Sequence, residues 1–253
     1  MTRTHLKHFR VYGDGYDLSG YERSLGAMGS THEVSPDTAI TDEVKNVIIG
    51  QPNISIAPIN GFLDNDTAGK FTLMKAGTGT RTMMIPIGAN AAPSAGVPVF
   101  AWQFEQTSYM VEPSNAGFSA ANLTLGDASF AGVLTYSKPW GVLVHAKGAE
   151  TAVNTAIGID DNGAQTTAGG IFCYQLFSSN GTVTLKMQDA STNTNPSFSD
   201  LSGATSGSIN ASVTPASSMV ALGTTATVRR YLRWQLVFGT ATTATFAIAF
   251  IRG

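Results

Sequence analysis

The chain has 253 residues, of which 43% are hydrophobic and only 13% are charged. This apolar content with so little charge excludes a disordered chain, and a net charge of −2 excludes a polyanion-binding protein of the usual basic kind. The single cysteine, Cys173, excludes an internal disulfide framework and a multi-cysteine metal site. No segment has the apolar length of a membrane-spanning helix or of a secretion signal. We therefore expect a protein made in a cytoplasm, with no membrane partner.

The first half of the chain predicts strands interrupted by one or two helices. A strand is expected over residues 9–12, followed by a glycine turn at 13–15. The clearest helix is predicted over residues 42–49, where Val44, Val47 and Ile48 share one face and Gly50 ends the run. A weaker helix is expected over residues 66–76.

Later segments alternate apolar and polar residues, which is typical of strands with one buried face. Such alternation covers residues 100–104, 182–188, 232–238 and 245–250. The dipeptides Asn180-Gly181 and Gly239-Thr240 are turn signals, and we expect them to join the neighbouring runs into hairpins. The second half therefore predicts a β-sandwich of jelly-roll type.

The charges are distributed unevenly along the chain. Residues 1–146 contain 9 Lys and Arg and 12 Asp and Glu, whereas residues 147–253 contain 6 and 5 and are rich in Ser, Thr and Ala. We place a boundary between about residues 138 and 168 and predict two mainly β domains, 1–146 and 147–253.

A search for catalytic or metal-binding patterns is negative. The four histidines are His5, His8, His32 and His145. The first two have a spacing suited to a metal but no plausible third ligand, and nearby basic residues oppose a cation. His145 follows an apolar run and is expected to be a hydrogen-bonded core or interface residue. Residues 160–163 read as a turn rather than a calcium site. We expect no enzyme, no cofactor and no bound metal.

One basic cluster stands out in the second half. Arg229, Arg230 and Arg233 surround Tyr231 and Trp234. On a strand, Arg229, Tyr231 and Arg233 would share one face. Arginine beside aromatic residues is compatible with nucleic-acid or sugar binding, but a solvated or intersubunit face is the favoured interpretation.

Several segments resemble the major tail (tail tube) proteins of long-tailed bacteriophages. The likeness is carried by a short first strand, the heptapeptide Gly15-Tyr16-Asp17-Leu18-Ser19-Gly20-Tyr21, the segment from Val44-Lys45 to Gly50, and residues 60–64. Residues 138–141, 149–154 and 228–234 resemble phage virion proteins that join such a domain to a β-rich C-terminal one.

The resemblance implies a virion protein with an N-terminal β-sandwich or barrel, whose copies form hexameric or trimeric rings stacked into a tube. Other tail proteins would be partners, and genomic DNA would pass without sequence-specific binding, which the net acidity of residues 1–146 suits. The C-terminal domain would lie outside the tube or form a second tube unit. Loops 88–98 and 113–126 would be inter-ring arms or ordinary surface loops.

Two other function classes are compatible with the sequence. One is a capsid decoration or tail-appendage protein whose C-terminal domain binds a glycan through Trp140, Tyr231 and Trp234, although core packing is the favoured role for each. The other is a virion-borne depolymerase, which would need an exposed acid pair. The acidic residues available in the second half are Glu150, Asp160, Asp161, Asp189 and Asp200.

Overall fold

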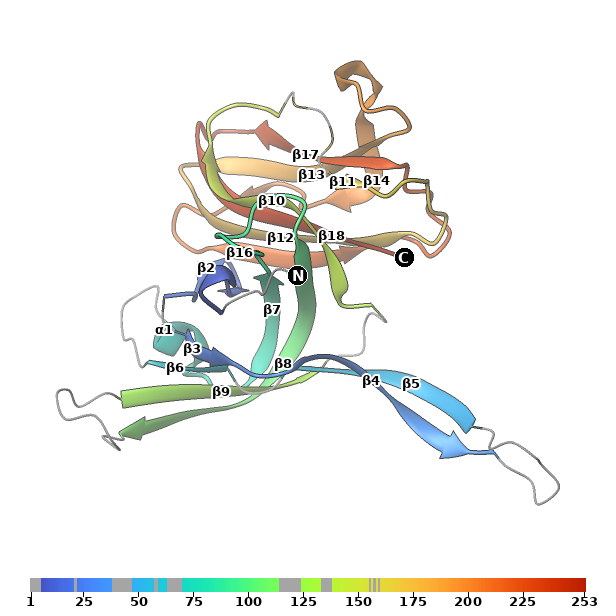
Figure 1. Ribbon diagram of the computed structural model, residues 1–253. Coiled ribbons are helices and arrows are strands. Elements are labelled where there is room, and N and C mark those ends of the chain that lie inside the picture. Colours follow the sequence, from blue (N-terminus) through green and yellow to red (C-terminus); the bar gives the residue numbers. More distant parts are fainter. Residues whose placement is uncertain are drawn as a thin grey trace.

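The computed structural model describes most of the chain and shows a mainly β protein built from antiparallel strands (Figure 1). The described residues are 6–20, 22–37, 47–56, 59–62, 70–113, 124–132, 138–154, 156, 158 and 160–253. The predicted mainly β class is confirmed.

The first part of the chain contains short strands near the N-terminus and much longer ones after residue 79. Its elements are η1 (Leu6–His8), β1 (Tyr12–Gly13), β2 (Tyr16–Asp17), β3 (Glu22–Leu25), β4 (Met28–Pro36), β5 (Val47–Ile56), β6 (Ile59–Phe62), α1 (Lys70–Met74), β7 (Gly79–Pro86), β8 (Pro98–Pro113) and β9 (Thr124–Gly132).

The remaining elements are almost all strands. They are β10 (Trp140–Glu150), β11 (Asp160–Asp161), β12 (Gly170–Ser179), β13 (Thr182–Ala190), η2 (Asn195–Ser197), β14 (Ser199–Thr205), β15 (Ile209–Asn210), β16 (Ala216–Ala221), β17 (Tyr231–Phe238) and β18 (Ala244–Arg252). No helix in the described part of the chain has the length and apolar character needed to cross a membrane.

The described strands form one large sheet, one smaller sheet and a separate ribbon. The large sheet has the order β16-β12-β18-β10-β8-β7-β1-β2, with β9 added to β8, then β6 and β3. The smaller sheet has the order β11-β17-β13-β14, with β15 also paired to β13. The ribbon consists of β4 and β5.

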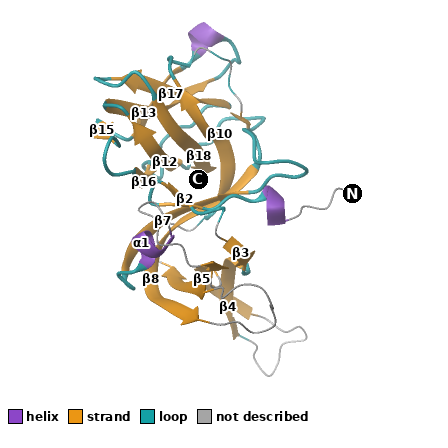
Figure 2. Cartoon of the chain, turned by 90° about the vertical axis from the view of Figure 1, so that its left-hand side faces the viewer, coloured by secondary structure: helices purple, strands orange, loops and turns teal. Residues whose placement is uncertain are grey.

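The smaller sheet packs on the β16-β12-β18-β10 end of the large sheet and forms a sandwich, seen at the top of Figures 1 and 2. The predicted alternation over residues 182–188 is confirmed, because Val183, Leu185 and Met187 are buried while the residues between them are not. Phe246 and Phe250 of β18 complete the same core from the opposite sheet. Burial of these large side chains is the main stabilising contribution to the sandwich.

The predicted hairpins at Asn180-Gly181 and Gly239-Thr240 are wrong. β12 and β18 belong to the large sheet, whereas β13 and β17 belong to the smaller one, so each turn crosses between sheets. The two turns are bonded to each other instead: Thr182 donates its backbone N–H to Thr240 Oγ1 (2.9 Å), and Thr242 donates its N–H to Asn180 Oδ1 (2.8 Å). β12 and β13 therefore contribute to one core from opposite sides, and so do β17 and β18.

The helix predicted over residues 42–49 is contradicted where the structure describes it. Val47, Ile48 and Ile49 begin strand β5 and pair with β4, while residues 42–46 lie outside the described residues. β-branched side chains favour a strand over a helix when a partner strand is present. Of the weaker helix at 66–76, the described part contains the five-residue α1.

The predicted turn at residues 13–15 is confirmed between β1 and β2. Asp14 has φ 49° and Gly15 has φ 81°, as the tightest hairpin turns require. A side chain at Gly15 would also lie 2.6 Å from Pro215 Cβ, because the turn is inserted against the C-terminal half. The Gly15 N–H donates to Gln175 Oε1 (2.6 Å), and Gln175 Nε2 donates to Thr82 O (2.9 Å).

The two halves share a sheet and a core. β10 pairs through its first three residues with β8 and through the rest of its length with β18. A buried cluster combines Tyr12, Met84 and Leu143 with Cys173 and Ala249. β10 therefore continues across the predicted boundary between residues 146 and 147. The division of the chain into two folding units, 1–146 and 147–253, stays a prediction.

Candidate assembly surface

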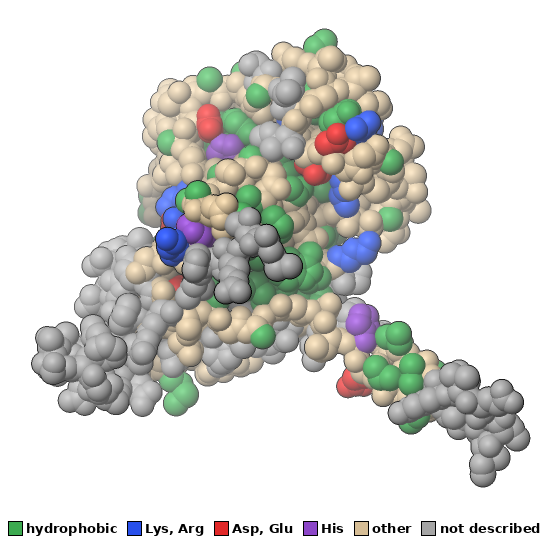
Figure 3. Space-filling view, viewed as in Figure 1, with side chains coloured by type: hydrophobic (Ala, Val, Ile, Leu, Met, Phe, Trp, Pro, Cys, Tyr) green, Lys and Arg blue, Asp and Glu red, His purple; other side chains and the backbone are tan. Residues whose placement is uncertain are grey.

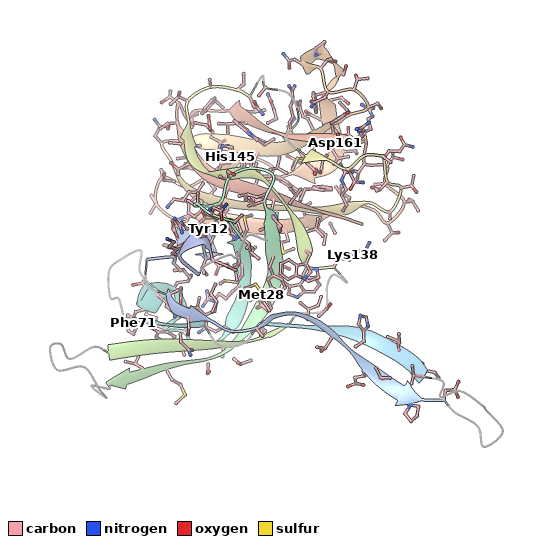
Figure 4. All side chains as sticks on the ribbon, in the orientation of Figure 1. Tyr12, Met28, Phe71, Lys138, His145 and Asp161 are labelled. Carbon is pink, nitrogen blue, oxygen red and sulfur yellow. The ribbon has the colours of Figure 1, made fainter. Side chains whose placement is uncertain are left out.

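The β4–β5 ribbon forms an arm that leads away from the body of the molecule (Figure 1). Its base is anchored, since Ile54 is fully buried in the N-terminal core and Met28 packs against that core (Figure 4). Farther out, residues 31–37 and 47–50 are all exposed. The arm is therefore a hydrogen-bonded strand pair whose outer part has no cover from the described residues.

One face of the outer arm is apolar. The register places Val34 opposite Ile49 and Pro36 opposite Val47. Residues two apart on a strand, and residues directly opposite on its partner, share a face. Val34, Val47 and Ile49 are 60%, 47% and 66% exposed. Figure 3 shows the resulting green side chains on the arm at the lower right.

A second projection is made by the end of the long strand β8 and its partner β9, at the lower left of Figure 1. Met110 and Val111 of β8 are exposed there. The described residues include ten exposed large hydrophobic side chains, and six of them lie on β4, β5 and the end of β8. Exposed apolar groups gathered on projecting strands mark surfaces that associate with other molecules.

The two loops predicted as possible inter-ring arms, 88–98 and 113–126, are not part of the β4–β5 arm. Loop 88–98 is held to the body at both ends, by the Gly88 N–H to His8 O (3.0 Å) and by the Gly96 N–H to Leu143 O (2.7 Å). Of 113–126, residues 114–123 lie outside the described residues, and the flanking residues are paired in β8 and β9.

The predicted surface of Arg229, Tyr231 and Arg233 divides into different environments. Arg233 is buried: its guanidinium donates to Gln188 Oε1, Ala156 O and Asn195 Oδ1 at 2.6–2.8 Å and lies over the Phe198 ring. This burial lowers the pKa of Arg233. Arg233 therefore holds surrounding loops in place and is not available as a ligand surface.

The other two members of this set are more accessible. Arg229 Nη1 donates to Ser199 Oγ (3.0 Å), and its backbone N–H donates to Asp189 Oδ2 (2.8 Å). Tyr231 is half-buried, with the Arg230 guanidinium 4.8 Å above its ring. Their role as an intersubunit or ligand surface stays a prediction.

The aspartates of the second half are neutralised by basic partners. Arg230 binds Asp161 through two hydrogen bonds (2.6 and 2.8 Å), which lower the pKa of Asp161 to about 2. Asp161 also accepts the N–H of Gly163, as expected of the predicted turn. The remaining pairs are Arg252–Asp160, Arg229–Asp189 and Lys186–Asp200.

His145 is a hydrogen-bonded core residue, as expected (Figure 4). It stacks on Phe246 (4.3 Å between centroids) and meets Trp234 edge-on (4.6 Å), while Nε2 lies 3.0 Å from Glu150 Oε1. Burial lowers the pKa of His145 despite this carboxylate. Trp234 is thus part of the core and unavailable for stacking a sugar, whereas Trp140 is 44% exposed.

The described residues contain no group of three or more His, Cys, Asp or Glu side chains that could hold a metal ion. His5, one of the two closely spaced N-terminal histidines, lies outside the described residues. Cys173 is fully buried, and burial raises the pKa of its thiol well above the usual value.

Two features of the structure were not predicted from the sequence: the arm and the contact made by Gln175. The β-branched run Val47-Ile48-Ile49 was the available signal for a strand in the arm. Gln175 stands as a polar residue in the otherwise apolar run from Ile171 to Leu176, and this interruption was the available signal for a buried polar contact.

No family model matches the chain, and no curated protein matches it. Among solved structures, the chain is similar to the Dit protein (gp 19.1) of SPP1, described as a paradigm of the hub adsorption apparatus in phages that infect Gram-positive bacteria. The sequence identity is 11% and the TM-score 0.29, over 96% of this chain and 99% of that one. A match at this TM-score carries no inference about the function of this chain.

Proposed function

We propose that this chain is a structural virion protein of a bacteriophage tail, and specifically that its copies assemble into stacked rings that form the tail tube, the conduit for DNA. The observation that carries the self-assembly is the pair of projecting strand hairpins, which bear six of the ten exposed large hydrophobic side chains among the described residues. The tail assignment comes from the sequence resemblance of residues 15–21 and 44–50 to tail tube proteins.

Assembly would take place by packing of the exposed strands of one copy on a neighbour. A two-stranded ribbon is marginally stable alone in water, and its open edges favour pairing with further strands. An arm anchored by Ile54 and apolar on one outer face becomes more stable when another copy covers it. Other tail proteins and passing DNA are further partners in this proposal.

The proposed role is non-catalytic. This part of the proposal is supported by the charge pairing of Asp160, Asp161, Asp189 and Asp200 with basic side chains and by the closeness of Glu150 to His145. A glycosidase needs two carboxyl groups facing a cleft, one of them free to donate a proton.

Electron microscopy of the purified protein at increasing concentration, with sedimentation velocity on the same samples, tests the proposal. We expect rings or tubes of uniform bore, and a sedimentation coefficient that rises with concentration. A monomer at every concentration would contradict self-assembly. Finite particles that bind a host glycan would instead favour the decoration or tail-appendage class.

A further inference from the structure

We propose that a polar hollow beside strand β2 binds a phosphate group, with Arg10 as its main ligand. The hollow has a volume of about 600 Å³ and is lined by Arg10, Asp17, Ser19, Gly20 and Lys147. Figure 3 shows basic side chains (blue) gathered at the left of the body, near the position of β2 in Figure 1. This inference goes beyond the proposed function and does not depend on self-assembly.

Backbone contacts restrict the orientation of the Arg10 guanidinium. Its Nη1 donates to the carbonyl oxygens of Lys7 (3.0 Å) and Phe9 (2.7 Å). Within the described part of the chain, Arg10 Nε and Nη2 make no hydrogen bond and the side chain makes no ion pair. Two neighbouring N–H groups of a guanidinium can donate in parallel to two oxygens of a phosphate or a carboxylate. Arg10 therefore offers free donors on a side chain that is already held in place.

Lys147 contributes a second cation to the lining. Its Nζ donates to Asp17 Oδ2 (2.7 Å) and lies 4.8 Å from the centroid of the Phe177 ring. An ammonium group has three N–H donors, so Lys147 can bind a further oxygen while it keeps its bond to Asp17. The Lys147 side chain is 35% exposed, which leaves it accessible to a ligand.

Asp17 contributes a carboxylate to the same lining, and both of its oxygens already accept hydrogen bonds. Oδ1 accepts the Ser19 N–H (3.1 Å) and the Ser19 hydroxyl (2.6 Å), and Oδ2 accepts Lys147. Burial raises the pKa of Asp17, but the hydrogen bonds from Lys147 and Ser19 outweigh it and hold the pKa below its usual value. Asp17 is therefore ionised at neutral pH and balances Lys147, so the charge of Arg10 remains uncompensated.

This arrangement suits one phosphate group better than a carboxylate or a polyanion. A carboxylate has only the two oxygens that the guanidinium would bind, whereas a phosphate has further oxygens for Lys147. The net charge of the whole chain is −2, which opposes tight binding of a polyanion. The phosphate group can belong to free phosphate or a small phosphate ester, or it can be a phosphodiester of a nucleic acid. The net charge favours the first source.

Isothermal titration calorimetry of the full chain with inorganic phosphate tests the site. We expect Arg10→Gln to weaken phosphate binding at least about tenfold, because it removes the charged donors. Arg10→Lys keeps the charge but loses the planar pair of donors, so its affinity should lie between the two. Lys138→Gln is the matched control and should leave binding unchanged, since it removes one exposed cation that is not part of this lining.

A second pair of variants leaves Arg10 and its backbone contacts intact. A Cβ added at Gly20 would have no atom within 4 Å, so the position has space for a side chain. Gly20→Asp brings a negative charge to the hollow and should weaken phosphate binding at least about tenfold. Gly20→Asn has nearly the same size without the charge and should weaken binding much less.

A short DNA duplex, titrated into the same variants, distinguishes the two sources of the phosphate group. Duplex binding that Arg10→Gln and Gly20→Asp both weaken would assign the site to a phosphodiester, whereas phosphate binding without duplex binding would assign it to free phosphate or a small ester. Absence of phosphate binding at millimolar concentrations would overturn the inference, and so would equal losses in Arg10→Gln and Lys138→Gln. Electron microscopy of assembly is read separately, so failure of this inference leaves the proposed function standing.

Discussion

Replacing Gln175 by Leu would remove the hydrogen bonds that join the N-terminal turn to the C-terminal half while nearly preserving side-chain size. Gln175 is fully buried; it accepts the Gly15 N–H (2.6 Å) and donates to Thr82 O (2.9 Å). The Thr82 oxygen keeps a second donor, the N–H of Asp14 at 3.0 Å. The main loss is therefore the buried Gly15 N–H, which would be left without its acceptor.

An unsatisfied buried donor costs about 1–3 kcal/mol, so we expect Gln175→Leu to lower the free energy of unfolding by about 2 kcal/mol. For a chain of this size, that corresponds to a fall in Tm of roughly 4–8 °C. Urea denaturation followed by circular dichroism and tryptophan fluorescence measures the change. Gln165→Leu is the control, because Gln165 is exposed. A loss below about 0.5 kcal/mol for Gln175→Leu, similar to surface substitutions, would refute the reasoning.

Three further substitutions test the side-chain environments. Burial lowers the pKa of His145 below its usual 6.5, so the unfolded chain binds a proton more readily than the folded one. The free energy of unfolding should therefore fall as the pH drops below 6.5, and His145→Gln should flatten this part of its pH profile. Arg233→Ala should lower the free energy of unfolding by about 2–3 kcal/mol, because three acceptors lose a buried guanidinium. Arg229→Ala, at a side chain that is 43% exposed, should lower it by about 0–1 kcal/mol. Equal losses for the two variants in urea denaturation would contradict this difference. Lys70→Met should cost about 3–5 kcal/mol by removing the buried cation 3.1 Å from Glu22, and added Glu22→Gln should recover part of that loss in thermal unfolding.

Strands β13 and β17 of the smaller sheet could be predicted because alternate residues in each lie on one buried face. Val183, Leu185 and Met187 alternate with polar residues, and so do Leu232, Trp234 and Leu236. Alternation reports burial of a face but does not identify the partner strand. Asn180-Gly181 suits a hairpin turn and a crossing between sheets equally well, so the sequence could not decide between them.

The arm could not be predicted by the same reasoning. Val47, Ile48 and Ile49 are apolar yet exposed in the single chain, and a pattern analysis that assumes apolar residues are buried within the chain assigns them to a helix face. The burial of Arg233 within the basic cluster could not be predicted for a related reason. Strand alternation places Arg233 on the outer face of β17, but Ala156 and Asn195, the first residue of η2, cover that face. Coverage by segments that are distant in the sequence leaves no local pattern.

The continuity of the large sheet through β10 has a mechanical consequence. Force applied to the arm or to the β8–β9 hairpin reaches the sandwich through the β8–β10 and β10–β18 hydrogen-bond ladders, and no flexible linker intervenes to absorb it. β10 is bonded to β8 through residues 140–142 and to β18 through residues 142–150, and sliding is resisted because the bonds of each ladder must break together. The two halves should therefore move as one stiff lever, and a displacement imposed at one end of the molecule should be transmitted to the other.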